Sequence, residues 1–342
     1  MSTGPTSSTG AAGPPAAGAA ELAKNDAPAP PEGLSEFLRK ILDQLSLSAW
    51  LPATMLVGCA ALLLQLAALA SVDIGAAILA LAEKPFGIIV ILLFALILTA
   101  IIVQAFSFEV IRFLEGYWGA SSLGAIVAHV LIEIQLRRVR KISNQRDKQE
   151  KRAFRRAHER MLSRNIPRSI LTILEDDVYR RRGVHSQADK DEARRLGWRQ
   201  FAAPQDLARF DRLSKRLDDF PAEHRILPTK LGNVLRSAED ALELADGDLE
   251  GLVMRRYDRI PERIRTHHDQ FRTRLDMYCI LFFVFIVLAM LSTLIVWRTQ
   301  GQLLSFLFPA TFALLALTAY AASITSARGY GASLRAIQRG PA

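Results

Sequence analysis

The chain has 342 residues, and half of them are hydrophobic. Its net charge is +9, because it contains 43 Lys and Arg residues and 34 Asp and Glu residues. A basic balance fits a nucleic acid or an anionic membrane surface as partner, and four long apolar runs favour the membrane. The two cysteines, Cys59 and Cys279, lie within or beside apolar runs, which excludes a disulfide framework.

Residues 1–33 are rich in Ala, Pro, Gly, Ser and Thr and show no apolar periodicity. Such a segment buries too little surface to offset its chain entropy, so we predict a disordered tail. In residues 34–48, apolar side chains recur at helical spacing opposite charged ones. We predict an amphipathic helix that lies flat on the membrane because it leads into an apolar run; packing on the protein's own soluble part is the alternative.

The segment 49–105 reads as a transmembrane hairpin. Trp50–Ala70 carries no charge and has about the ~20 residues that a spanning helix needs. Ser71–Lys84 carries Asp73, Glu83 and Lys84 and therefore reads as the turn, with room for a short apolar helix at Ile78–Ala82. Pro85–Ala105 is the second predicted span, with Pro85 at a helix start where its missing N–H is not needed.

The segment 106–277 is basic, and we predict that it is almost wholly helical. Pro167 is the main helix breaker in its first half. The predicted elements, in order, are an amphipathic exit segment at Phe106–Gly119, a long helix at Ser121–Asn165, a shorter helix at Ile170–Tyr179, a polar loop at Arg181–Lys190 and a helix at Gln205–Phe220.

The segment 278–325 reads as a second hairpin, entered without a break from a helix that starts at Glu262. Its spans are Tyr278–Trp297 and Leu303–Ile324. A link of only a few residues forces them to be antiparallel neighbours. Residues 326–342 form a tail. Most Lys and Arg residues lie between the second and third spans, so the positive-inside rule predicts that the middle and both termini are cytoplasmic.

A basic block, Arg137–Arg156, follows an apolar stretch of the long helix. We interpret Arg137, Arg138, Arg140 and Lys141 as contacts to anionic lipid headgroups, at about 1 kcal/mol per basic residue near the surface. A solvated helix face that only sets the orientation and a dedicated partner site are the alternatives. Only Phe154 interrupts the charges, so the block offers no stacking platform for bases, and nucleic acid is the weakest of these options.

Phe220–Asp240 (FPAEHRILPTKLGNVLRSAED) is the most distinctive local sequence. Thr229 is placed to cap a helix with an apolar stripe, and a glycine inside that helix costs about 1 kcal/mol relative to alanine, which indicates close packing. One interpretation is a structural element that caps and docks. The other is a partner or ligand site made of Pro228, Thr229, Lys230, Gly232, Asn233, Arg236 and Glu239.

Two motifs, Leu227–Asn233 and Arg112–Gly119 (RFLEGYWG), carry a resemblance. Together with the span order, they make residues from about 35 to 325 similar to uncharacterised bacterial multi-pass membrane proteins that are frequent in actinobacteria. The resemblance implies the four-span architecture, and it implies no enzymatic activity.

Recognisable catalytic, cofactor and metal motifs are absent from the sequence. Asp246–Gly251 matches the start of an EF-hand loop, but the twelfth position, where a bidentate Glu is needed, is Tyr257. The six histidines have no ligand spacing. The predicted spans lack ionisable residues in their interiors, which argues against a proton-coupled carrier, and we expect Gln65 and the Ser292–Thr293 pair to form interhelical hydrogen bonds.

These observations predict an all-α membrane protein with four transmembrane helices in two hairpins, joined by a helical cytoplasmic domain, in a bacterial plasma membrane. The leading hypothesis for its function is a non-catalytic interaction or regulatory module whose cytoplasmic helices bind a protein partner or lipid headgroups. The alternative is a channel or transporter subunit that forms a pore lined by Gln65, Thr99 and Thr293. We expect no catalytic residue, no cofactor and no bound metal.

Overall fold

A computed structural model describes residues 47–68, 73–118, 121–242, 260–298 and 306–339, and these are almost entirely helical with no strand among them. The predicted tail, nearly all of the predicted amphipathic helix at 34–48 and the EF-hand-like Asp246–Gly251 lie outside the described residues. In the described part, four helices are long and apolar enough to cross a membrane. The predicted all-α architecture with four spans is therefore confirmed.

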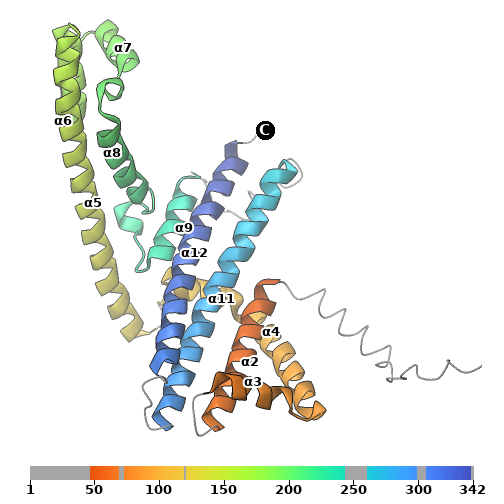
Figure 1. The fold of residues 1–342 in the computed structure, drawn as a ribbon. Coiled ribbons are helices and arrows are strands. Elements are labelled where there is room, and N and C mark those ends of the chain that lie inside the picture. Colours follow the sequence, from red (N-terminus) through yellow and green to blue (C-terminus); the bar gives the residue numbers. More distant parts are fainter. Residues whose placement is uncertain (1–46, 69–72, 119–120, 243–259, 299–305, 340–342) are drawn as a thin grey trace, which may run out of the picture. The chain divides into compact units, whose positions relative to one another are not determined.

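The first hairpin consists of α2 (Leu47–Ala68), α3 (Ile74–Ala82) and α4 (Phe86–Glu115), and α2 packs on α4 (Figure 1). α3 is capped by Asp73, whose carboxylate accepts a hydrogen bond from the backbone N–H of Ala76 at 3.0 Å. The predicted exit segment is not a separate element, because α4 runs unbroken through it to Glu115.

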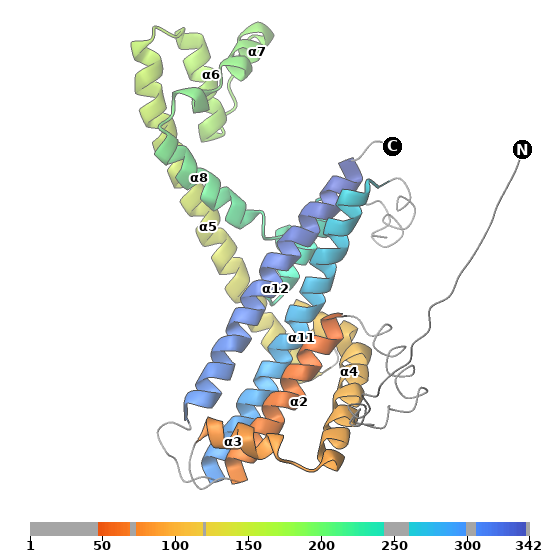
Figure 2. The same ribbon diagram turned by 45° about the vertical axis from the view of Figure 1, so that its right-hand side comes forward.

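The second hairpin consists of α11 (Glu262–Arg298) and α12 (Leu307–Arg339), which lie side by side along their lengths (Figures 1 and 2). α11 has no break between its polar start and its apolar part, as predicted. The predicted start of the fourth span at Leu303 lies outside the described residues, and α12 continues to Arg339, through most of the segment assigned to a tail. α11 also packs on α2, so the two hairpins share a core. That core contains Leu63, Ile280, Leu281, Val284, Phe285, Leu288, Ala316 and Ala319.

The hydroxyls of Ser292 and Thr293 do not bridge helices. Both donate to the carbonyl of Ala289 in their own helix, at 2.9 and 2.7 Å. The prediction that this pair forms interhelical hydrogen bonds is therefore wrong. Ser and Thr inside a helix commonly bond to the carbonyl three or four residues back, which satisfies the hydroxyl without a second helix.

The central segment begins with α5 (Ser122–Ser163), a helix of 42 residues. At 1.5 Å per residue it is about 63 Å long. Pro167, which cannot continue a helix, stands directly before α6. The elements that follow are α6 (Arg168–Tyr179), α7 (Gln187–Leu196), the 3-10 turn η1 (Trp198–Phe201), α8 (Pro204–Leu217), the 3-10 turn η2 (Glu223–Arg225) and α9 (Lys230–Asp240).

The end of α5, together with α6, α7 and η1, forms a small head with its own hydrophobic core. Phe154 is buried at its centre, and its ring meets those of Trp198 and Tyr179 edge-on at 5.8 and 6.4 Å. All buried residues of this core come from 153–202. The head therefore packs on the far end of α5 with a core that no membrane span enters.

The predicted loop Arg181–Lys190 is wrong in its second half, because α7 starts at Gln187. The Ser186 side chain caps that helix by accepting a hydrogen bond from the Asp189 N–H at 3.2 Å. α7 buries Ala193 alone among its residues. Its sequence is polar enough to read as a loop, although its cap and packing make it a helix.

Candidate functional site: the junction of two sequence motifs

The first motif ends α4 with a left-handed turn. Gly116 has φ of +101°, a conformation that glycine adopts without strain, and the N–H of Tyr117 returns to the carbonyl of Arg112 at 3.1 Å. The Trp118 indole donates to the carbonyl of Phe113 at 2.7 Å. These contacts fix the end of α4 and leave the carbonyl of Glu115 as an acceptor for another element.

The second motif supplies the partner for that carbonyl. The Thr229 hydroxyl donates to the carbonyl of Glu115 at 2.9 Å and accepts from the N–H of Gly232 at 3.0 Å. One hydroxyl therefore caps α9 and bonds its N-terminus to the C-terminus of α4. The predicted cap at Thr229 is confirmed.

The surroundings of Gly232 explain why α9 carries a glycine near its start. A Cβ at this position would lie 2.1 Å from the carbonyl oxygen of Glu115. At Gly116, a Cβ would lie 2.4 Å from Cγ of Pro228. The two motifs thus meet at two close contacts, Gly232 against the Glu115 carbonyl and Gly116 against the Pro228 ring, and each contact requires the small residue that the sequence provides. The close packing predicted at Gly232 is confirmed.

Asn233 is fully buried and holds the turn before α9 closed. Its amide donates to the carbonyls of Leu227 and Thr229 at 2.9 and 2.8 Å, and its oxygen accepts from the N–H of Leu227 at 2.8 Å. Both amide hydrogens and the side-chain oxygen are therefore used within the chain. Asn233 is a structural residue here, since its polar atoms face its own turn.

The apolar stripe of α9 inserts among the spans. Leu231, Val234 and Leu235 belong to one buried cluster. The other members come from α4, α11 and α12, and they are Leu114, Leu275, Cys279, Ile324 and Ala327. Since Leu231 is fully buried and Leu235 is 8% exposed, this stripe is occupied within the chain and does not face a partner.

The remaining residues of the candidate partner element are only partly buried. Arg236 lies 3.4 Å from the Tyr117 hydroxyl and 3.3 Å from the Glu239 carboxylate. Lys230 follows the cap. Burial, and next the charge of Arg328, lower the pKa of the Lys230 ammonium group. Of the seven candidate residues, Pro228, Gly232 and Asn233 are buried in the docked turn, and Thr229, Lys230, Arg236 and Glu239 lie at its edge.

The proposed headgroup contacts, Arg137, Arg138, Arg140 and Lys141, are all exposed on α5. Arg140 also lies 3.6 Å from the exposed carboxylate of Glu223. The part of α5 that precedes these four residues presents an exposed apolar stripe. Its members are Leu123, Ile126, Val130 and Ile134, between 51% and 76% exposed.

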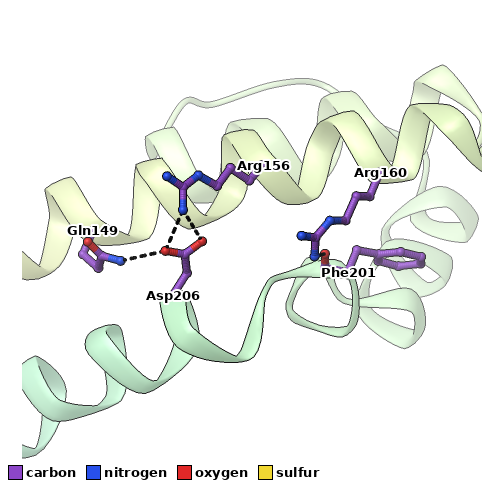
Figure 3. Close-up of polar contacts among 5 residues, drawn as sticks. All are labelled: Gln149, Arg156, Arg160, Phe201 and Asp206. Atoms are coloured by element: carbon purple, nitrogen blue, oxygen red, sulfur yellow. Dashed lines mark hydrogen bonds and ion pairs between the residues drawn. The ribbon is translucent and has the colours of Figure 1, made fainter.

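The end of the basic block has a partner that sequence reasoning missed. Arg156 forms two hydrogen bonds with the carboxylate of Asp206, at 3.1 and 2.9 Å, and Gln149 reaches the same carboxylate at 3.5 Å (Figure 3). The Asp206 side chain is 5% exposed. Arg160 donates to the carbonyl of Phe201 at 3.0 Å. These contacts attach α8 and η1 to α5, so this part of the block is not merely a solvated face.

A second buried carboxylate was also missed. Asp219, just after α8, accepts two hydrogen bonds from the Arg328 guanidinium of α12, at 2.8 and 2.6 Å. The sequence around Asp206 gave an indication of its role, because a carboxylate in the first turn of a helix is favoured by the helix dipole. The sequence around Asp219 gave no such indication, since its partner Arg328 lies 109 positions away.

The predicted pore residues, Gln65, Thr99 and Thr293, lie on three different helices. Gln65 and Thr99 are half-buried on α2 and α4, and Thr293 is exposed on α11. Among the described residues, no three His, Cys, Asp or Glu side chains gather as metal ligands would.

Comparison of the chain with known protein families, curated proteins and solved structures gave no match.

Proposed function

We propose that this chain is a non-catalytic membrane-anchored interaction module, in which the spans hold a helical head that binds a protein partner. The observation that carries the proposal is the head's separate core on the far end of α5. A small core built apart from the spans stabilises a surface that the membrane helices do not need. This arrangement favours the presentation of that surface to another molecule.

The junction between α4 and α9 supports this role mechanically. α4 ends at Glu115 and α5 starts at Ser122, so α5 is joined to the last turn of a span by only a few residues. The bond from Thr229 and the contact at Gly232 fix that last turn against α9. A head attached through such a joint is held at a defined distance from the spans.

Lipid contact is part of the same proposal. The exposed apolar stripe of α5 fits the acyl region of a bilayer, and the basic residues Arg137, Arg138, Arg140 and Lys141 follow it directly. Basic residues at the border of an apolar surface favour anionic headgroups. We propose that these four residues contact such headgroups and fix the depth of α5.

The orientation and the compartment are also proposals. The excess of Lys and Arg between the second and third spans favours a cytoplasmic location for the head. Gln338, near the end of α12, donates to the carbonyl of Leu242 at 2.5 Å, so the end of α12 and the end of α9 belong to one side of the spans. We propose a bacterial plasma membrane with this side in the cytoplasm.

The partner proposal is tested by crosslinking in native membranes, followed by purification of the full-length chain. We expect one protein to be recovered in an amount comparable to the bait. The double variant Arg194→Glu/Arg195→Glu changes two exposed residues of α7 and should reduce that recovery at least tenfold. The matched control Arg209→Glu/Arg212→Glu makes the same charge change on the exposed face of α8 and should retain the partner.

Equal recovery with both variants, or no stoichiometric partner with the unchanged chain, contradicts the proposal. In that case, ion or solute flux through liposomes that contain the purified chain would favour the channel or transporter alternative.

A further inference from the structure

A cavity of about 430 Å³ lies between the end of α8, the middle of α9 and the last third of α12. Its size falls in the range of roughly 300–1,000 Å³ that is usual for small-ligand sites. Basic side chains from two separate elements line it. The polar residues relevant to its chemistry are Lys215, Arg216, Asp219, Ser237, Arg328 and Arg335.

The walls of this cavity are fixed by contacts within the chain. The Ser237 hydroxyl donates to the carbonyl of Asp218 at 2.5 Å, which ties the end of α8 to α9. A Cβ at Gly331 would lie 2.6 Å from Cβ of Ala238, so α9 and α12 are in close contact there. The paired hydrogen bonds between Arg328 and Asp219 join α12 to the end of α8. All three elements are therefore held in place without a ligand.

The charge of the cavity is unbalanced in favour of cations. Arg328 is matched by Asp219. Lys215, Arg216 and Arg335 form no ion pair with any described residue, and Asp218 is the remaining carboxylate in the lining. An anion that enters this space meets these three cationic groups, none of which is paired with a described carboxylate.

Further cations gather next to the cavity. The pKa of Lys230 is lowered by burial first and then by the charge of Arg328, with smaller effects of Arg138 and Arg216 in the same direction and an opposing effect of Asp219. Arg138 belongs to α5 and is one of the residues assigned to headgroups, so basic groups from α5, α8, α9 and α12 act on the same region.

The predicted end of the fourth span would place the start of the cavity at the depth of lipid headgroups. Arg328 stands four positions after Ile324, the last residue of the predicted fourth span, which is about 6 Å along the helix. The polar layer on each side of a bilayer is roughly 5–8 Å thick. Arg335 lies about 16 Å past Ile324 on the same measure. The lining therefore extends from the headgroup layer outward.

We propose that this cavity binds a phosphate-bearing anion, with Arg216, Arg335 and Lys215 as its direct contacts and the Arg328–Asp219 pair as its fixed wall. The planar guanidinium group matches two phosphate oxygens at once, which makes arginine the residue best suited to phosphate recognition. The phosphate is supplied either by a phospholipid headgroup or by a soluble phosphate ester. This site does not depend on whether the head has a protein partner.

The test uses the purified full-length chain in maltoside micelles and two probes. The first is phosphatidylglycerol with a fluorescent acyl chain, whose binding is followed by anisotropy. The second is sn-glycerol 3-phosphate, followed by titration calorimetry. The cavity variant is Arg216→Gln/Arg335→Gln, which leaves the Arg328–Asp219 pair intact. The matched control is Arg209→Gln/Arg212→Gln, which removes the same charge from the exposed face of α8.

We expect the cavity variant to bind at least one probe tenfold or more weakly than the unchanged chain, and the control variant to change its affinity less than twofold. Loss confined to the lipid probe identifies a headgroup as the source, and loss for glycerol phosphate identifies a soluble ester. If the unchanged chain binds neither probe, or if the two variants weaken binding equally, the proposal is overturned.

Should the cavity variant aggregate, the single substitution Lys215→Glu at an exposed position replaces it. It should weaken binding at least threefold, and an unchanged affinity would overturn the proposal in the same way.

Discussion

Two glycines and one threonine decide how the central segment joins the spans. Gly116 provides the left-handed turn that ends α4, and Gly232 leaves room for the carbonyl of Glu115 beside α9. Thr229 bonds to both helices with one hydroxyl. Gly116 is required for its positive φ, Gly232 for its missing Cβ and Thr229 for its short hydroxyl side chain. Conservative changes at these positions should therefore have different and predictable effects.

Gly232→Ala should destabilise the chain although alanine is the better helix former. The helix gains about 1 kcal/mol from alanine, but the Cβ would lie 2.1 Å from a backbone oxygen, and overpacking of this kind costs about 1–3 kcal/mol or more. We expect a lower midpoint of thermal unfolding in detergent. Gly58→Ala is the control, because a Cβ there meets nothing within 4 Å, and a matching decrease for Gly58→Ala would contradict the explanation.

Thr229→Val and Thr229→Ser separate the hydroxyl from the shape of the side chain. Valine keeps the shape but loses the cap of α9 and leaves the Glu115 carbonyl without its donor, which should cost about 1–3 kcal/mol. Serine keeps both hydrogen bonds and should stay within about 1 kcal/mol of the unchanged chain. Thermal unfolding of both variants checks the order, and an equal loss for serine would show that the methyl group matters more than the hydroxyl.

At the scale of elements, the long helix α5 carries different chemistry along its length. Its first turns are apolar and exposed, its middle is basic and exposed, and its end supports the core of the head. α8 returns along it (Figure 2) and is attached through the buried carboxylate of Asp206. The contact between α5 and α8 therefore depends on a charge pair of which one member is buried and the other is largely exposed.

Arg156→Gln should disturb this contact more than Asp206→Asn does. Removal of the arginine leaves a buried carboxylate without its cation, whereas removal of the carboxylate leaves an arginine that water can solvate. We expect faster amide hydrogen exchange in Pro204–Leu217 for Arg156→Gln, a smaller change for Asp206→Asn, and none for the exposed neighbour Arg155→Gln. The reverse order for the first two variants would show that the pair does not hold α8.

The proposed orientation of the molecule places the head in the cytoplasm. Val184 is fully exposed in the turn between α6 and α7. A cysteine at this position should react with a membrane-impermeant maleimide only after the cells are permeabilised. The unchanged chain, with Cys59 half-buried and Cys279 buried, gives the background. Labelling of Val184→Cys on intact cells would place the head outside and reverse the proposed orientation.

Local sequence patterns were sufficient to predict the four spans, the unbroken α5 and α11, and the cap at Thr229. These features follow from local rules: apolar length, the absence of helix breakers and side-chain bonds to nearby backbone. The sequence also indicated that something packs closely against Gly232, because a glycine inside a helix is costly.

What each of these elements contacts depends on how the helices pack, which no local pattern predicts. The partner of Gly232 is a carbonyl more than a hundred positions away, and the partner of Asp219 lies 109 positions away. The two motifs meet although nothing in either local sequence points to the other. The start of α7 was not predicted because its polar residues are typical of a loop. The structure shows the helix there, with the Ser186 side chain as its cap. The cavity between α8, α9 and α12 has no local pattern at all, since its basic residues are brought together only when three helices pack.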